Sequence, residues 1–351
     1  MASSAFMHVE ELEYVAGAEL GLAPARAKPA LAPSLLIVFV FEAALFLFVA
    51  AAACRILLTP RPATISERDA KTRLVWIDKS GHSIKSLDLK GRYTSPRTFP
   101  SSAPILLNKI EPSRSSIWSL SLDDLKKPMI PMDGRTGFGI LAPSGKEIVF
   151  ESWSDGVMRS NIESGRFKPI RLGTEIAGLP QDWSNDGRWI ALTRKRGQSE
   201  ELWLFDVSTG RATMFRKARE LSEPRFSPDS RWIAFAASFG GDEDIYRVAV
   251  PGTAAASRRG GELMMRISPD GGYSCRWGES VDELFYLDSD QDMVAVQLDA
   301  GTLVPTQFRK IFHLRSMTGP DYEYRFDGYG LDTLRNAFVF ALARAAKREG
   351  H

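Results

Sequence analysis

The sequence has little cysteine, little histidine and no excess of charge of either sign. Its only cysteines are Cys54 and Cys275, which excludes a disulfide framework. The four histidines are His8, His82, His313 and His351. No two of them have the spacing of metal ligands. The 45 basic and 43 acidic residues give a net charge of +2, far from the clustered basic excess of a nucleic-acid-binding protein.

Recognisable catalytic motifs are also absent from the sequence. It contains no G-x-S-x-G nucleophile elbow and no glycine-rich phosphate loop. Residues 288–292 read DSDQD, but this stretch lacks the central glycine and the terminal glutamate of an EF-hand calcium loop. We predict a solvated hairpin tip there and at Asp242–Asp244. We therefore assign no catalytic, cofactor-binding or metal-binding residue, and we expect no cofactor.

One long apolar run stands out near the N-terminus. Residues 35–53 contain a single charged residue, Glu42, and are long enough to span a bilayer. We predict a transmembrane helix over residues 34–57. A cleaved signal peptide is one alternative, although about 33 residues precede the run, which is long for such a peptide. A second alternative is that the AAAC sequence ending at Cys54 is a degenerate lipoprotein cleavage site.

Two features of this segment leave its role open. Glu42 costs on the order of 3 kcal/mol in a membrane helix, so it is either a tolerated acid or a contact with another membrane helix. Arg26 and Lys28 precede the run, and more basic residues follow it, beginning with Arg55 and Arg61. By the positive-inside rule this would keep the following domain in the cytoplasm, but long domains translocate largely regardless of charge.

The rest of the chain divides into a tail, a spacer and a repeat region. Residues 1–33 are acidic and then Ala/Pro-rich, which predicts a mobile tail. Residues 58–71 carry Pro60 and Pro62 and then turn polar, as expected of a linker. Residues 72–345 contain a repeat with a period near 42, the length of a four-stranded propeller blade. Its landmarks are Phe99, Leu141, Trp183, Phe226 and Trp277.

The two clearest copies begin at Trp183 and Phe226 and align almost without gaps. Each has a Ser-Asn-Asp or Ser-Pro-Asp turn, in which aspartate bonds its own backbone and the next residue accepts a positive φ. An apolar strand follows, at residues 189–192 or 232–235, with a small alanine where strands crowd near the axis. The repeat's tryptophans are predicted to be mostly core between blades, and a carbohydrate-stacking role for one of them is the alternative.

The two ends of the repeat region each resemble half a blade. Residues 74–81, LVWIDKSG, resemble the later half, and residues 329–340 resemble the earlier half. Pairing strands from both ends would close the ring and remove two exposed sheet edges. We therefore predict an all-β fold, a six-bladed β-propeller, preceded by one transmembrane helix.

These motifs resemble the TolB-like repeats, also called WD40-like or PD40 repeats, over about 270 residues. The layout of membrane helix, LVWIDKSG opening and ELFYLDSDQDMVAVQL near the end is similar to the extracytoplasmic sensor half of bacterial membrane serine/threonine kinases and transcription regulators. Those proteins usually carry a cytoplasmic kinase or winged-helix domain before the helix. Residues 1–33 lack the kinase motifs, so we expect no kinase activity. The resemblance implies a propeller outside the cytoplasmic membrane.

The expected function is binding rather than catalysis. A propeller gathers loops on two rigid faces, and this sequence shows no reactive set of residues. We expect a non-catalytic sensor or scaffold module that is anchored in the cell membrane. Its expected partner is another protein, with a membrane protein as one candidate, and not nucleic acid. The alternative is a hydrolase of the lactonase or glycosidase type, with acidic residues at the central channel.

Overall fold

The computed structural model describes residues 71–98, 104–111, 115–120, 127–128, 136–162, 170–172, 178–257, 264–314 and 324–344. All of these lie in the second of the two compact units of the chain, residues 63–351. The predicted tail and transmembrane helix, and all but the last residue of the predicted linker, lie outside the described residues. Among the residues described, no helix is long and apolar enough to cross a membrane.

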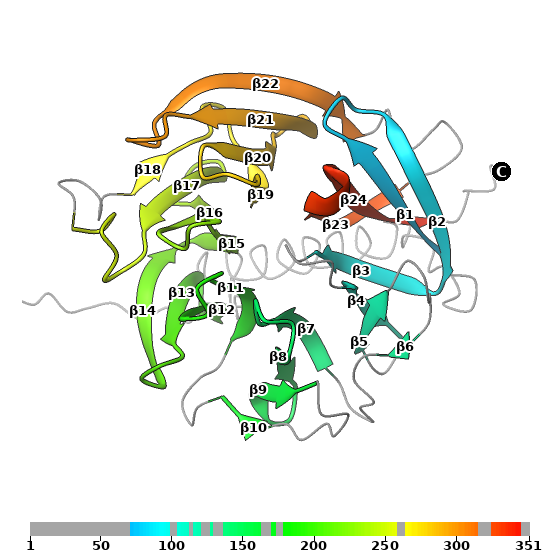
Figure 1. The fold of residues 1–351 in the computed structure, drawn as a ribbon, viewed down its shortest axis with the longest axis horizontal. Helices are drawn as coiled ribbons and strands as arrows, with labels where there is room; N and C mark the ends of the chain where they lie inside the picture. The colour runs from blue at the N-terminus through cyan, green and yellow to red at the C-terminus, as the bar shows by residue number, and fades with distance from the viewer. Residues whose placement is uncertain are drawn as a thin grey trace, which may run out of the picture. The chain divides into compact units, whose positions relative to one another are not determined.

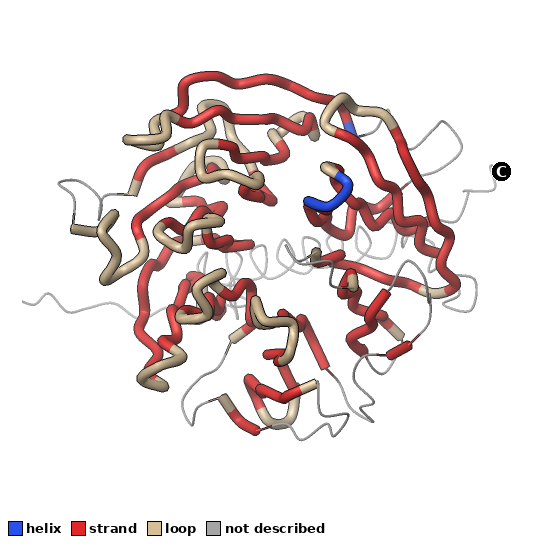
Figure 2. The backbone as a smooth tube through the Cα atoms, in the orientation of Figure 1, coloured by secondary structure: helices blue, strands red, loops and turns tan. Residues whose placement is uncertain are grey.

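The described residues form six antiparallel four-stranded sheets around a central axis (Figures 1 and 2). We call these sheets blades 1 to 6 in the order of their first strands. The predicted six-bladed propeller is therefore confirmed.

Each of the first three blades is built from four consecutive strands. Blade 1 consists of β3 (Arg92–Arg97), β4 (Ile105–Ile110), β5 (Ser115–Leu120) and β6 (Lys127–Pro128). Blade 2 consists of β7 (Thr136–Leu141), β8 (Glu147–Ser152), β9 (Gly156–Asn161) and β10 (Ile170–Arg171). Blade 3 consists of β11 (Leu179–Trp183), β12 (Trp189–Arg196), β13 (Ser199–Asp206) and β14 (Arg211–Ala218).

The other three blades include the one that joins the two ends of the domain. Blade 4 consists of β15 (Glu220–Phe226), β16 (Trp232–Ser238), β17 (Asp244–Ala249) and β18 (Met265–Arg266). Blade 5 consists of β19 (Tyr273–Trp277), β20 (Glu283–Leu287), β21 (Asp292–Leu298) and β22 (Pro305–His313). Blade 6 consists of β23 (Tyr324–Asp332), β24 (Ala337–Arg344), β1 (Lys71–Asp78) and β2 (Ser83–Lys90), and the short helix η3 (Thr333–Arg335) lies between β23 and β24.

Blade 6 confirms the predicted ring closure. Strand β1 pairs antiparallel with β24 along its length, from Thr72 opposite Ala343 to Asp78 opposite Ala337. The side chain of Trp76 is fully buried, and its Nε1 donates to Asp332 Oδ2 at 3.0 Å. The N-terminal and C-terminal strands are thus joined by backbone hydrogen bonds and by a buried side-chain contact.

The innermost strands differ from one detail of the sequence analysis. The strands that carry the small Ala191 and Ala234 were expected to crowd near the axis, but they are β12 and β16, second from the axis. The innermost strands are β3, β7, β11, β15, β19 and β23, which ring the centre in Figure 1. The small alanines are fully buried within the blades instead. A buried strand has the same apolar pattern whether it is the first or the second strand from the axis, so the sequence pattern did not distinguish these two positions.

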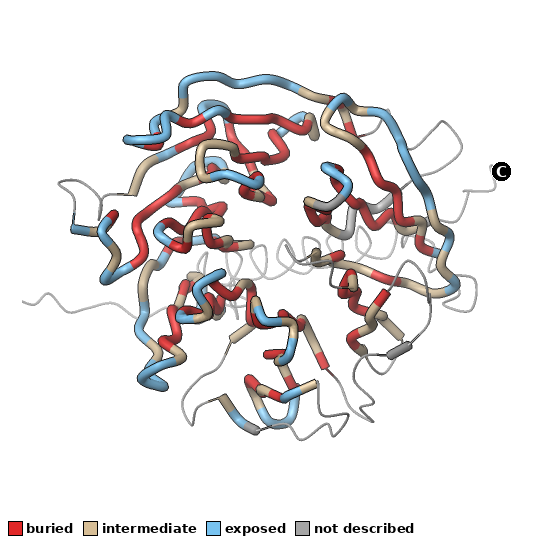
Figure 3. Tube along the Cα trace, in the orientation of Figure 1, coloured by how far each residue is buried: buried red, intermediate tan, exposed pale blue. Residues whose placement is uncertain are grey.

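The core lies between neighbouring blades, as the buried inner segments in Figure 3 show. Between blades 5 and 6, the rings of Phe285 and Phe338 meet edge to face with centroids 4.9 Å apart. Tyr329 and Phe340 stack in the same cluster at 5.3 Å. Of the repeat's tryptophans, five are buried, as predicted: Trp76, Trp183, Trp189, Trp232 and Trp277.

The turns have the predicted chemistry. Asp186 Oδ1 accepts from Ser184 Oγ at 2.6 Å and from the backbone N–H of Arg188 at 3.0 Å. Asp229 makes the equivalent contact with Ser227 Oγ at 2.6 Å. The next residues, Gly187 and Ser230, have the expected positive φ, 76° and 59°. These local bonds fix where each inner strand ends and so where its last side chains point.

The two acidic segments lie at hairpins, as predicted, but Asp244 and Asp288 are buried rather than solvated, because each accepts hydrogen bonds from neighbouring groups. Asp288 Oδ1 accepts from the backbone N–H groups of Asp290 and Asp292 at 3.0 and 2.8 Å, which closes the turn between β20 and β21. Lys310 Nζ lies 2.7 Å from Asp292 Oδ2, and His313 Nδ1 lies 2.8 Å from Asp292 Oδ1. Basic side chains of β22 thus neutralise this acidic tip.

Candidate functional site

The centre of the propeller is lined by one equivalent position from each inner strand. This residue pairs with the second strand just before the turn, as Arg225 pairs with Ala234 and Arg276 with Phe285. From blade 1 to blade 6 the residues at this position are Arg97, Ile140, Asp182, Arg225, Arg276 and Gly330. Three of the six positions carry arginine, which is unusual for a position that faces the interior of a domain.

A backbone irregularity precedes each of these arginines. Ser95, Glu223 and Ser274 lie two residues before them and have positive φ values of 52°, 46° and 54°. Each lies where the register between the first and second strands shifts, as at a β-bulge. A positive φ is uncommon for residues other than glycine, and bulges often redirect a side chain at a functional site. The three bulges turn the three guanidinium groups toward the axis.

Blade 6 has the same bulge but no side chain at the channel position. Gly328 has a φ of +102°, and Gly330 follows two residues later. A Cβ at Gly330 would lie 2.9 Å from the backbone oxygen of Pro96, so β3 and β23 pack too closely for any larger residue. The arginines therefore enter the channel from blades 1, 4 and 5 only.

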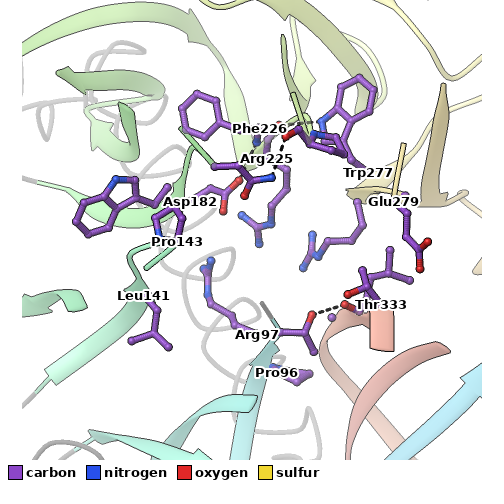
Figure 4. Close-up of a pocket in the computed structure, with 18 residues that line it drawn as sticks. Pro96, Arg97, Leu141, Pro143, Asp182, Arg225, Phe226, Trp277, Glu279 and Thr333 are labelled. Carbon is purple, nitrogen blue, oxygen red and sulfur yellow. Dashed lines mark hydrogen bonds between the residues drawn. The ribbon is translucent and has the colours of Figure 1, made fainter. Parts of the chain in front are cut away.

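The three arginines lie between two cavities. One has a volume of about 460 Å³ and the other about 400 Å³, and Pro96, Arg97, Arg225 and Arg276 line both. Figure 4 shows Arg97, from β3, and Arg225, from β15, extending into the larger cavity from opposite sides. We call the three arginines the arginine floor of the channel.

Two of these arginines share a carbonyl group. Both Arg97 Nη1 and Arg225 Nη1 donate to the backbone oxygen of Gln181, the latter at 2.9 Å. Arg97 Nη2 also donates to Gln181 Oε1 at 3.4 Å. Among the described residues, no carboxylate lies within ion-pair distance of Arg97. Its bonds are therefore to neutral acceptors. Burial, together with the charges of Arg225 and Arg276, lowers the pKa of Arg97 to about 9, so it stays protonated at neutral pH.

Glu223 neutralises part of the arginine floor. Its Oε2 lies 2.7 Å from Arg276 Nη1 and 3.5 Å from Arg225 Nη2, and its Oε1 accepts from Ser274 Oγ at 2.8 Å. Burial opposes ionisation of this carboxyl, but Arg276 and Arg225 outweigh burial and lower its pKa to about 2. Arg276 is held further by a bond from Nη2 to the backbone oxygen of Tyr329 at 2.8 Å.

Asp182 occupies the channel position of blade 3. Its Oδ2 accepts from the backbone N–H of Phe226 at 2.7 Å, which links blades 3 and 4. Burial raises the pKa of Asp182, although Arg225 and the N–H of Phe226 act in the opposite direction. Even with Asp182 and Glu223 both ionised, three guanidinium groups leave one positive charge uncompensated on the floor.

The mouth of the larger cavity is apolar and aromatic. It is lined by Trp183, Phe226 and Trp277, the landmark residues of three repeats, and by Pro143 and Pro228 from the following turns. Trp277 Nε1 donates to the backbone oxygen of Arg225 at 3.0 Å, and Trp183 Nε1 donates to that of Gly187 at 3.0 Å. These bonds fix the indole rings beside the floor. An apolar cavity with a few fixed polar groups is typical of a ligand-binding site.

The smaller cavity opens among acidic residues. Glu200 and Glu223 line it, and Glu200 Oε2 accepts from the backbone N–H of Leu221 at 2.7 Å. Nearby, Glu243 accepts from Ser222 Oγ at 2.9 Å, and burial raises its pKa, with Glu220 and Glu223 adding to the effect. The three arginines line both cavities, and each cavity also has two carboxyl groups in its lining, Asp182 and Glu279 in the larger and Glu200 and Glu223 in the smaller. The aromatic side chains of the larger cavity distinguish the two ends.

The arrangement is suited to binding an anion. The described residues contain no group of three or more histidine, cysteine or acidic side chains positioned to hold a metal ion. Cys275, beside the floor, is buried, and burial raises the pKa of its thiol to about 12, so it is not a nucleophile at neutral pH. His82 lies in the turn between β1 and β2, and His313 lies at the end of β22, both away from the channel. His8 and His351 lie outside the described residues.

The sequence analysis assigned no residue to this site and so missed the three arginines. A signal was present, because Arg225 and Arg276 immediately precede the landmarks Phe226 and Trp277. The triplets SPR, EPR and SCR, ending at Arg97, Arg225 and Arg276, also share a pattern. The alternative hypothesis placed acidic residues at the channel without naming any. Asp182 and Glu223 lie there, and they contact a backbone N–H group and arginines, respectively.

Comparison with known proteins supports a TolB-like propeller. No protein-family model matches the chain. It is 33% identical over 108 residues to the Tol-Pal system protein TolB of Desulfosudis oleivorans, covering 30% of this chain and 25% of that protein. It is 39% identical over 59 residues to the Tol-Pal system protein TolB of Francisella tularensis subsp. mediasiatica, covering 16% of this chain and 14% of that protein. The match thus spans a quarter or less of these relatives.

A solved structure has a similar fold. A protein of Agrobacterium tumefaciens assigned as TolB superposes with a TM-score of 0.57 at 18% identity, over 80% of this chain and 99% of that one. At this identity the likeness concerns the fold. The chain is a TolB-like six-bladed β-propeller.

Proposed function

We propose that this protein is a non-catalytic binding module that holds a partner protein at the aromatic mouth of its central channel. The observation that carries the proposal is the arginine floor, three guanidinium groups turned inward by three separate bulges. A fold that needed only stability would place apolar residues there, since like charges that are largely removed from water lower stability. Residues kept at such a cost are usually kept for function.

The channel's acidic residues support binding over the hydrolase alternative. A glycosidase needs two carboxyl groups with distinct protonation roles facing the substrate. Here Glu223 is fixed between Arg276 and Ser274, and Asp182 bonds the backbone of blade 4. Similarity to proteins named as Tol-Pal system proteins adds to the same interpretation.

We also propose that residues 34–57 anchor the propeller to the cell membrane and that the propeller lies outside the cytoplasm. The support is the apolar run of residues 35–53 and the layout that resembles membrane sensors. Fusion of alkaline phosphatase after His351 should give an active reporter in bacteria, and a fusion of a cytoplasm-dependent fluorescent protein should stay dark. The reverse pattern would place the propeller in the cytoplasm, as the flanking charges suggest.

The position of the partner can be tested by photo-crosslinking in cells. A photoreactive phenylalanine in place of Asn185, which lines the aromatic mouth, should give a discrete adduct with one protein. The same probe at Thr213, on the exposed outer strand β14, serves as the matched control and should give none. An adduct from the probe at Thr213 alone, or no adduct from the probe at either position, would contradict binding at the mouth.

A further inference from the structure

We propose that the arginine floor binds a carboxylate at the end of a polypeptide chain, so that the partner enters the channel by its C-terminus. The inference rests on the proposed function and names the group that the channel would recognise. Three features of the described residues carry it: an excess of positive charge at the channel positions, guanidinium N–H groups that face a cavity, and an apolar mouth.

The charge favours a monovalent anion. Glu223 forms ion pairs with Arg276 and Arg225, and the charge of Asp182 acts on Arg225 and, less strongly, on Arg97. The hydrogen bonds of Arg97 go only to the neutral oxygens of Gln181. One negative charge would balance the floor. A carboxylate supplies one charge, whereas a phosphate monoester carries about 1.5 to 2 at neutral pH. Two further carboxyl groups lie at the cavities. Glu279 lines this mouth but is exposed, where water and salt screen its charge. Glu200 lines the smaller cavity, where its Oε2 accepts from the backbone N–H of Leu221.

The donors favour a planar, two-oxygen acceptor. A guanidinium group has five N–H donors, and the bonds of Arg97 are made by Nη1 and Nη2 to a single residue. Arg225 has more partners, since its Nη1 donates to two backbone oxygens and its Nη2 lies 3.5 Å from Glu223 Oε2. The remaining N–H groups of both residues lie at a floor that both cavities share. Arginine binds carboxylates through two parallel hydrogen bonds, so this geometry fits a carboxylate.

The mouth favours a peptide over a small polar acid. A volume of about 460 Å³ lies above the floor, and Trp183, Phe226 and Trp277 line it. These side chains offer apolar surface to the residues that precede the terminal carboxylate. Capture of a C-terminal carboxylate is a known mode of peptide recognition, and aromatic anchors commonly carry such interfaces. An internal acidic side chain would require the peptide to enter as a loop.

The test uses the full chain, purified in mild detergent and immobilised. Two pools of random hexapeptides are passed over it, identical except that one ends in a free carboxylate and the other in an amide, and the retained peptides are identified by mass spectrometry. The acid pool should be retained at least tenfold more than the amide pool, with apolar residues enriched before the terminus. Arg97→Gln should abolish the difference in retention between the two pools. Arg97→Lys keeps the positive charge but not the two parallel N–H donors of the guanidinium group, and should retain part of that difference.

The controls separate this inference from the proposed function. Arg211→Gln removes the same charge from the exposed strand β14 and should bind like the wild type. Equal retention of both pools, or no retention of either, would overturn the inference. So would displacement of the retained acid peptides by inorganic phosphate at a concentration 10-fold lower than the concentration of acetate that displaces them. If the mouth of the wild type still forms an adduct in cells, binding of a partner would stand while its terminal carboxylate would not be the group recognised.

Discussion

Deletion of residues 71–90, which form β1 and β2, should abolish cooperative unfolding of the propeller. Without β1, strand β24 loses its hydrogen-bonded partner along seven residue pairs, and the ring opens with exposed sheet edges. The core between blades 6 and 1 also loses Leu74 and Trp76, both fully buried. Circular dichroism during heating would show a broad, low-amplitude transition in place of a sharp one.

A single substitution tests the same closure more finely. Trp76→Ala should lower the free energy of unfolding by about 3 to 5 kcal/mol, because it removes a buried indole and leaves Asp332 without one of its donors. Trp153→Ala is the matched control, since Trp153 is 63% exposed, and its effect should be about 0.5 kcal/mol or less. An unchanged melting temperature in the deletion variant would contradict closure by the N-terminal strands.

Glu223→Gln should be the most destabilising isosteric substitution in the channel. It removes the carboxylate that contacts Arg276 at 2.7 Å and leaves Asp182 as the carboxyl group at the channel position beside three partly buried guanidinium groups. Removing one partner of a fully buried ion pair costs about 3 to 5 kcal/mol. Because the Glu223 side chain is 30% exposed, we expect a smaller loss of about 1 to 3 kcal/mol, which urea unfolding at pH 7 measures. Glu220→Gln, an exposed position on the same strand, is the control and should change stability by about 0.5 kcal/mol or less.

The pH dependence of this loss has a definite sign. The pKa of Glu223 falls from 4.5 to about 2 on folding, so its contribution is present above about 4.5 and is lost as the pH falls toward 2. The difference between wild type and Glu223→Gln should therefore be smaller at pH 3 than at pH 7. A difference that is the same at both pH values would show that the loss is not due to the charge of Glu223.

A second substitution should recover part of that stability. Arg97→Met in the Glu223→Gln background removes one of the three like charges, and the backbone oxygen of Gln181 keeps Arg225 as a donor at 2.9 Å. The double variant should therefore be more stable than Glu223→Gln alone, as expected of residues that interact. If the two effects simply add, the charges on the floor do not act on one another.

The architecture was predictable from the sequence because its determinants are local. The turn at Ser184 and Asp186 is closed by bonds within a few residues, and its repetition at Ser227 and Asp229 sets the period of the blades. Ring closure was predictable for a related reason. The residues around Trp76 and Phe338 look like two halves of one repeat, so matching them required no knowledge of distant contacts.

The site was not predictable in the same way because side-chain direction depends on tertiary structure. Arg225 and Arg276 follow strand patterns that are compatible with a solvent-facing position, and only the bulges at Glu223 and Ser274 turn them inward. The absence of an arginine in blade 6 depends on the close approach of Gly330 to Pro96, which are 234 residues apart in the chain. No local pattern reports such a contact.

The central claim is that the channel binds and does not catalyse, and a substrate screen tests it most directly. The purified chain is assayed against ester, lactone, glycoside and peptide substrates, with and without divalent metal ions. Asp182→Asn, which keeps an acceptor for the backbone N–H of Phe226, is assayed in parallel. The account predicts no turnover above the rate without protein for either form. Reproducible turnover by the wild type that Asp182→Asn abolishes would contradict it and establish the channel as an active site.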